Sequence, residues 1–143
     1  RFASEDVGLA DPQALPLAVA AYEACHFIGM PECSVNLSQT VIYLSLAPRS
    51  NSAYTAYEAC KKDAQDTLAQ PVPLVIRNAP TGLMKELDYG KGYQYAHDCP
   101  EKMARMQCLP DNLKDRRYYY PTEEGREKEL KAKLDKVRAW RES

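Results

Sequence analysis

Residues 11–29 read DPQALPLAVAAYEACHFIG, and this stretch decides which fold is expected. Asp11 precedes Pro12, the order typical of a helix N-cap followed by a first helical residue, and Gly29 stands where a helix ends. Between these ends nearly every side chain is apolar or small, so the helix has almost no polar face. We therefore expect it at the centre of an all-α fold or in an interface between subunits. Pro16, one turn in, predicts a distorted first turn.

Two further helices are expected after this stretch. Asn36 and Gln39 have the spacing of a capping box at the start of an apolar helical run. Ser50 or Asn51 then caps a third helix, whose row of small residues allows close helix packing. Residues 12–69 thus predict a core of three antiparallel helices joined by short turns.

Residues 70–121 break the helical pattern. Prolines beside Leu74–Ile76 predict an extended strap, and Thr81–Leu87 predicts a short helix. The remainder has no period, with at most one short pairing between residues 93–95 and 117–119. So long an irregular segment is uncommon unless it is functional or held by packing.

A charged terminal helix is expected over residues 122–142, with Thr122 as its N-cap. Glu127 and Lys131 form one of three acid–base pairs spaced four residues apart, which support a helix modestly. The apolar stripe is narrow, so we expect a solvated arm that lies on the body or on a neighbouring subunit. The three parts of residues 11–143 are expected to make one C-terminal domain.

The first residue is an arginine, and we interpret residues 1–10 as the end of a helix from a preceding lid or linker in a longer protein. The chain has 143 residues, 45% of them hydrophobic and 27% charged, as in an average globular domain. No apolar run approaches the roughly 18 residues that a membrane-spanning helix needs. Five cysteines without a C-x-x-C pair argue against a disulfide framework and favour a reducing cytoplasm.

Charge is spread unevenly along the chain. Residues 1–48 carry one basic and five acidic side chains, a balance of −4, whereas residues 49–143 carry 18 basic and 15 acidic ones, a balance of +3. The asymmetry leans towards a polyanionic partner for the later part, although it is far below the basicity of a dedicated nucleic-acid domain.

Catalytic motifs are mostly absent. Gly90-Lys91 lacks the first glycine and the hydroxyl of a phosphate-binding loop, so this chain is not expected to hydrolyse ATP by itself. The cysteines and histidines are too sparse for a zinc site. His97 and Cys99 have the spacing of a base and a nucleophile on one strand face, which leaves a small Cys/His hydrolase as a remote alternative. We expect no catalytic residue, metal or cofactor in this fragment.

The stretch from residue 77 to residue 97 interleaves basic and tyrosine side chains around a Gly-Lys-Gly bend. Lysine and arginine bind phosphates and tyrosine rings stack on bases, so a nucleic-acid-binding module is one interpretation. The alternative is that the tyrosines pin a loop to the body. The candidate DNA or phosphate contacts are Arg77, Lys85, Lys91, Tyr93, Arg116 and Arg117.

Five segments carry a resemblance to a known family: SEDVGLADPQAL (4–15), FIGMPEC (27–33), LAPRSNSAY (46–54), VPLVIRNAPTGLMKELDYGKGYQYAHD (72–98) and LPDNLKDRRYYYPTEEGRE (109–127). In this order they resemble the C-terminal region of the RarA/MgsA family, replication-associated recombination AAA+ ATPases whose eukaryotic relatives are the Werner-helicase-interacting proteins. The terminal segments are similar to the bacterial branch. The residues that carry this signature are Asp11, Pro12, Gly29, Asn78, Pro80, Tyr89, Gly90, Gly92 and Tyr95.

The resemblance implies an all-helical domain, similar to a clamp-loader collar, that assembles an ATPase into a homotetramer. It implies work at stalled replication forks, in recombination and repair, with DNA and single-stranded-DNA-binding protein as partners. It also implies a cytoplasmic, nucleoid-associated protein whose ATP and Mg sites precede Arg1. The sequence departs from the family at Pro16, where a helix former is usual, and at Asp88, where glycine is usual.

Overall fold

The computed structural model describes all 143 residues and contains helices and turns without any β-strand, so the expected all-α class is confirmed. The chain divides into two compact units. The first comprises residues 1–62 together with 118–143, and the second comprises residues 63–117.

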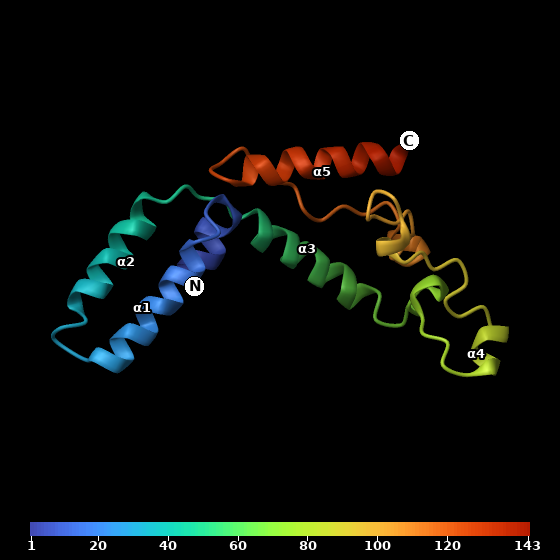
Figure 1. Cartoon of the computed structure of the whole chain (residues 1–143), viewed down its shortest axis with the longest axis horizontal. Helices are drawn as coiled ribbons and strands as arrows, with labels where there is room; N and C mark the ends of the chain where they lie inside the picture. The colour runs from blue at the N-terminus through green and yellow to red at the C-terminus, as the bar shows by residue number, and fades with distance from the viewer. The chain divides into compact units, whose positions relative to one another are not determined.

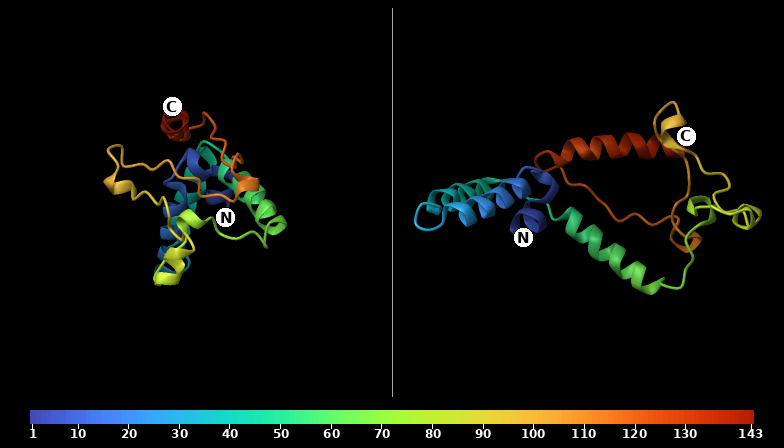
Figure 2. Two further views of the ribbon diagram at one scale, coloured as in Figure 1. Left: turned by 90° about the vertical axis from the view of Figure 1, so that its right-hand side faces the viewer. Right: turned by 60° about the horizontal axis from the view of Figure 1, so that its bottom comes forward.

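The first unit is built on an antiparallel hairpin of α1 (Ala14–Ile28) and α2 (Ser34–Leu46), which lie side by side in Figures 1 and 2. Asp11 caps the turn that leads into α1, because its Oδ1 accepts a 3.0 Å hydrogen bond from the N–H of Gln13. α1 itself begins at Ala14, two residues after the start expected at Pro12. The N–H of Ala14 bonds the carbonyl of Asp11, only three residues back, at 3.1 Å. Pro16 is the third residue of α1, where its missing N–H costs no helical hydrogen bond, and the N–H of Leu17 bonds the carbonyl of Gln13 at an ordinary 3.0 Å. The distortion predicted from Pro16 is therefore not seen in these bonds.

The capping box predicted at Asn36 is wrong. α2 already begins at Ser34, so Asn36 lies inside the helix, where its carbonyl accepts a 2.8 Å bond from the hydroxyl of Thr40. The helix starts early because the turn before it is closed by backbone bonds. The N–H of Cys33 donates to the carbonyl of Gly29 at 3.0 Å, and Gly29 has a φ of +79° that suits glycine.

A small core lies where a π-helical turn (Ala3–Val7) and a 3-10 turn (Gly8–Ala10) pack at the base of the hairpin. Its buried members have short side chains, and they are Ala3, Val7 and Ala14, with Ala18, Leu44 and Ala47 packed against them. The two helices of the hairpin therefore bury little beyond the strip where they touch.

α3 (Ser52–Asp66) starts beside Ser50, whose hydroxyl accepts a 3.3 Å bond from the N–H of Ser52, as the cap prediction requires. It ends about three residues before the expected limit. α5 (Glu127–Glu142) begins five residues later than expected, because Gly125 turns the chain at a φ of +51°. Thr122 caps that turn instead, accepting a 3.3 Å bond from the N–H of Glu124.

The second unit contains short elements joined by irregular chain. The extended strap predicted at Leu74–Ile76 is wrong, because this segment is a 3-10 turn closed by a 3.1 Å bond from the N–H of Ile76 to the carbonyl of Pro73. α4 (Gly82–Glu86) is one residue shorter at each end than the predicted helix Thr81–Leu87, and Thr81 is its N-cap. Further 3-10 turns are Ala96–Asp98 and Asp111–Leu113. The short pairing predicted for residues 93–95 is also wrong, since no residue of the chain forms a strand.

Candidate functional site

The signature bend of the second unit is pinned through Gly90. Its N–H donates a 2.8 Å hydrogen bond to the carbonyl of Leu74. Gly90 has a φ of +72°, and a β-carbon there would lie 3.2 Å from the carbonyl oxygen of Arg77. Glycine is therefore required both by the backbone conformation and by the close approach of the neighbouring segment. Gly92 also has a positive φ, of +80°, so both glycines shape the bend.

Arg77 is engaged inside this loop. Its guanidinium lies 5.0 Å from the centre of the Tyr89 ring, and its Nε donates to the carbonyl of Val72. A cation–π contact of this kind contributes about 0.5–1 kcal/mol at an exposed site. Arg77 and Tyr89 thus clamp the segment before α4 to the segment after it, within the second unit. Pinning of this loop to the helical body stays a prediction. Asn78 and Pro80 lie in the link between this clamp and α4.

Lys91 is paired as well. Its Nζ lies 2.9 Å from Oδ1 of Asp88, and both side chains are exposed. Asp88 has a φ of +61°, a left-handed conformation that glycine adopts freely and aspartate tolerates. This conformation gives a physical reason for the glycine that the family resemblance implies at this position.

The remaining candidate DNA or phosphate contacts differ in whether their side chains already have a partner within the chain. Arg116 is paired with Asp63, with Nε 3.1 Å from Oδ2. Arg117 is exposed. Lys85, on α4, is exposed, and its side chain forms no ion pair or hydrogen bond. Tyr93 and Tyr95 have 55% and 54% of their surface exposed, and the ring of Tyr95 packs at a tilt of 51° against His97, with ring centres 5.1 Å apart. Lys85 and the two tyrosines are therefore the members most open to a partner.

The side chains of Cys99 and His97, which the hydrolase alternative requires as a pair, contact other groups and not each other. The thiol of Cys99 points to the carbonyl of Tyr95 at 3.7 Å, while the ring of His97 packs on Tyr95. The carbonyl of His97 accepts a bond from Lys102. No group of three or more histidine, cysteine, aspartate or glutamate side chains gathers in positions that would hold a metal ion.

No helix is both long and apolar enough to cross a membrane.

The hairpin of the first unit exposes many large apolar side chains. α2 contains no charged residue, and α1 contains only Glu23 and His26. We name as the hairpin surface six large apolar side chains of α1 and α2 that are mostly exposed: Tyr22, Phe27, Val35, Val41, Ile42 and Leu46. Leu46 and Phe27 are 82% and 84% exposed, which is unusual for residues of their size.

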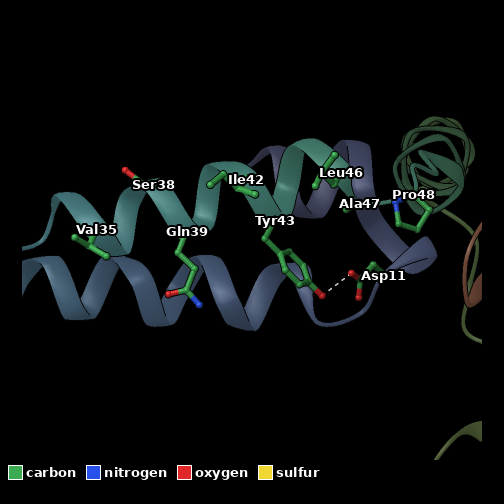
Figure 3. Close-up of a pocket in the computed structure, with 9 residues that line it drawn as sticks. All are labelled: Asp11, Val35, Ser38, Gln39, Ile42, Tyr43, Leu46, Ala47 and Pro48. Atoms are coloured by element: carbon green, nitrogen blue, oxygen red, sulfur yellow. Dashed lines mark hydrogen bonds between the residues drawn. The ribbon is translucent and has the colours of Figure 1, made fainter.

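A groove of about 660 Å³ runs along α2 (Figure 3). It is lined by Val35, Ile42, Leu46 and neighbours, and Asp11 and Tyr43 close one end. The hydroxyl of Tyr43 donates a 2.7 Å bond to Oδ2 of Asp11. Asp11 thus caps the turn before α1 with one oxygen and fixes Tyr43 with the other. The hydrogen bond raises the pKa of Tyr43, and burial adds to it.

Sequence reasoning missed a buried carboxylate at the start of α5. Glu127 is fully buried, although its spacing from Lys131 predicted a solvated pair. Burial alone would raise the pKa of Glu127, but hydrogen bonds from neighbouring hydroxyls outweigh it and lower the pKa to about 2. The hydroxyls belong to Ser50, Ser52, Thr122 and Tyr119. No local spacing signals this cluster, because Ser52 lies 75 residues away. Lys131 instead pairs with Glu123.

Comparison with known proteins places this sequence in a family. The family model described as the MgsA AAA+ ATPase C terminal matches residues 1–138. Over 137 residues the chain is 47% identical to the Replication-associated recombination protein A of Haemophilus influenzae, covering 95% of this chain and 31% of that protein. The protein of the same name from Coxiella burnetii is 46% identical over 139 residues, covering 96% and 32%.

A eukaryotic relative matches too. The ATPase WRNIP1 of Dictyostelium discoideum is 44% identical over 120 residues, covering 83% of this chain and 14% of that protein. The chain spans about a third of the length of the bacterial relatives. The match to the family model runs from the first residue almost to the last, and the all-helical structure agrees with it. The chain therefore belongs to the MgsA AAA+ ATPase C-terminal family.

Proposed function

We propose that this chain is the oligomerisation domain of a AAA+ ATPase that acts in replication and recombination, and that copies of it associate through the hairpin surface. The observation that carries this proposal is an uncharged helix, α2, with large apolar side chains in water. Fully burying one such side chain contributes about 1.5–3 kcal/mol. Six of them on one hairpin supply a driving force that a monomer leaves unused.

The groove along α2 supports the same proposal. Its apolar walls accept side chains of a second copy, and residues lining it also belong to the hairpin surface. Identical patches that meet face to face produce a twofold dimer. We propose a homotetramer, as the family resemblance implies, in which a second contact joins two such dimers. Residues 1–10 then link the collar-like domain, residues 11–143, to the ATPase part of the protein.

Sedimentation velocity of this chain at tens of micromolar tests the proposal. The wild-type chain is expected to sediment as an oligomer, and the double change Val41→Lys with Ile42→Glu is expected to shift it to monomer because charge would be buried in the contact. The matched control is Leu83→Lys on α4, an exposed leucine outside the hairpin. A monomeric wild type, or an oligomer unaffected by the double change, would contradict the proposal.

Contact with DNA through the second unit is the second candidate function. It is favoured by an unpaired lysine, Lys85, in the same unit as two exposed tyrosine rings. Of the other proposed contacts, Arg77, Lys91 and Arg116 must give up or share an internal partner to reach a phosphate. Arg117 also has an interaction within the chain. We therefore place the main contribution on Lys85 and Tyr93.

Fluorescence anisotropy with a single-stranded oligonucleotide over a range of salt concentrations tests this. Lys85→Glu is expected to weaken binding and to lower the salt slope by about 0.7 for one lost phosphate contact. Tyr93→Ala is expected to weaken binding without changing the slope. Lys128→Glu, an equal charge change on exposed α5, is the control. Equal losses from Lys85→Glu and Lys128→Glu would argue for a general charge effect only.

We further propose that this domain has no catalytic role of its own. ATP and Mg²⁺ would bind to the preceding part of the protein, and single-stranded-DNA-binding protein would be a docking partner of the assembly. The names of the relatives, which refer to replication and recombination, support a cytoplasmic, nucleoid-associated place of action. ATP hydrolysis by the full-length protein but not by this chain is the expected result.

A further inference from the structure

Three sulfur atoms gather at the turn that joins α1 to α2. Sδ of Met30 lies 3.2 Å from Sγ of Cys33. The thiol of Cys25 donates to the backbone carbonyl of Cys33 at 3.8 Å, so both cysteines meet at this turn. The residues come from the end of α1, the turn itself and the position before α2. Neither assembly through the hairpin surface nor DNA contact uses this cluster.

The three residues differ in exposure, from a buried cysteine to a methionine that solvent can reach. Cys33 is only 3% exposed, Cys25 is half-buried, and Met30 is 72% exposed. An exposed methionine is free to extend into solvent, yet its sulfur turns back onto the buried thiol. The backbone around the site is fixed, since the N–H of Gly29 bonds the carbonyl of Cys25 and the N–H of Cys33 bonds the carbonyl of Gly29, both at 3.0 Å.

The ligand set selects the kind of ion. Hard cations such as Mg²⁺ and Ca²⁺ take oxygen ligands, which this cluster does not offer. Structural zinc sites take four thiolate or imidazole ligands. Two thiolates with a thioether are instead the soft ligands that Cu(I) prefers. We propose that Cys25, Met30 and Cys33 bind one Cu(I) ion in a three-coordinate site.

The binding step is a ligand exchange without electron transfer. Each thiol loses its proton to solvent and donates an electron pair from its thiolate, and the thioether donates a lone pair without losing a proton. One Cu(I) ion therefore replaces two protons. The bound ion links the end of α1 to the residue before α2, which stabilises the turn of the hairpin.

Competition for Cu(I) against bicinchoninate, under anaerobic conditions, tests the proposal on the whole chain. The chain used carries Cys60→Ser, Cys99→Ser and Cys108→Ser, so that only the two cysteines of the cluster remain. It is expected to withdraw one Cu(I) per chain. Adding Cys33→Ser is expected to abolish this, and Met30→Leu, which preserves volume, is expected to weaken affinity by on the order of tenfold.

Two further measurements decide the outcome. Copper-edge X-ray absorption is expected to show three sulfur neighbours in the three-serine chain and two after Met30→Leu. Circular dichroism and sedimentation verify that Met30→Leu keeps its fold and assembly state, which separates this test from that of oligomerisation. The proposal is overturned if the three-serine chain leaves Cu(I) with bicinchoninate, or if Met30→Leu binds as tightly as its parent.

Discussion

The hydroxyl of Tyr119 donates a 2.8 Å hydrogen bond to the carboxylate of Glu127, and so ties the segment before α5 to the first residue of that helix. The carboxylate also accepts bonds from Ser52, at the start of α3, and from Thr122, at 2.6 Å. No cation takes part. Burial and the bond to Glu127 together raise the pKa of Tyr119 to about 12, so the phenol stays a donor at neutral pH.

Replacing this carboxylate by an amide of the same shape is expected to destabilise the first unit. Glu127→Gln removes a charged acceptor and places an NH₂ group among hydroxyl donors, which should cost about 1.5–3 kcal/mol in the free energy of unfolding. Urea unfolding followed by circular dichroism measures the change. Glu129→Gln, on an exposed part of the same helix, is the control and should remain within about 0.5 kcal/mol of wild type. Equal stability of the two variants would contradict the role of Glu127.

The same group predicts a pH dependence. Because folding lowers the pKa of Glu127 from 4.5 to about 2, its contribution is complete above pH 4.5 and is lost as the pH falls towards 2. By pH 3 the wild type should have lost about 2 kcal/mol from this group alone. The test is the difference in the free energy of unfolding between wild type and Glu127→Gln at several pH values. The contributions of the other carboxylates are the same in both chains and cancel in this difference. A difference that stays constant from pH 7 to pH 3 would refute the assignment.

Two glycines of the chain should respond oppositely to alanine. Gly125 has a φ of +51°, and a β-carbon there would overlap the carbonyl of Ala10. Gly125→Ala is therefore expected to cost about 1–3 kcal/mol. Gly82 lies in α4 with nothing within 4 Å of its β-carbon position, so Gly82→Ala should be neutral or stabilise by about 0.5–1 kcal/mol. Thermal unfolding of both variants measures this, and a harmless Gly125→Ala would show that the turn before α5 can move.

The Tyr43–Asp11 bond at the end of the groove should make a small, measurable contribution. Tyr43→Phe removes the hydroxyl but keeps the ring, so the expected loss is about 0.5–1 kcal/mol in urea unfolding. Tyr57→Phe, on exposed α3, is the matched control. If the two variants lose the same amount, Tyr43 contributes by its ring alone.

Arg77→Lys separates loop pinning from phosphate contact, because it keeps the charge and removes the planar group that lies over Tyr89. Losing about 1 kcal/mol of this clamp should speed amide hydrogen exchange of Gly90 roughly fivefold. Lys85→Arg should leave that amide unchanged. Unaltered protection of Gly90 in Arg77→Lys would show that the clamp does not hold the bend.

Local chemistry made part of this structure predictable from the residues. The turn at Asp11 before α1 and the end of α1 at Gly29 were predictable, because capping and positive φ depend on the residue itself and its immediate neighbours. The short helix α4 was predictable to within one residue at each end for the same reason. The pinning interpretation of the 77–97 stretch also rested on local features, the glycines and tyrosines of one bend.

Long-range packing decided what could not be predicted. Glu127 has the spacing of an exposed helix pair, yet hydroxyls from Ser52 and Tyr119 surround it once the chain is folded. The N–H of Arg126 bonds the carbonyl of Ala10, more than a hundred residues earlier, and this sets where α5 starts. Leu74–Ile76 has the composition of a strand, but no partner strand exists to pair with it.

The absence of charge from α2 separates the two proposed activities by their response to salt. Sulfate and similar excluded salts strengthen apolar contacts, so assembly through the hairpin should tighten as they are added. Binding of a lysine to DNA phosphates weakens under the same conditions. One salt titration of the same sample would therefore drive subunit association up and DNA occupancy down, which gives each surface its own experimental signature.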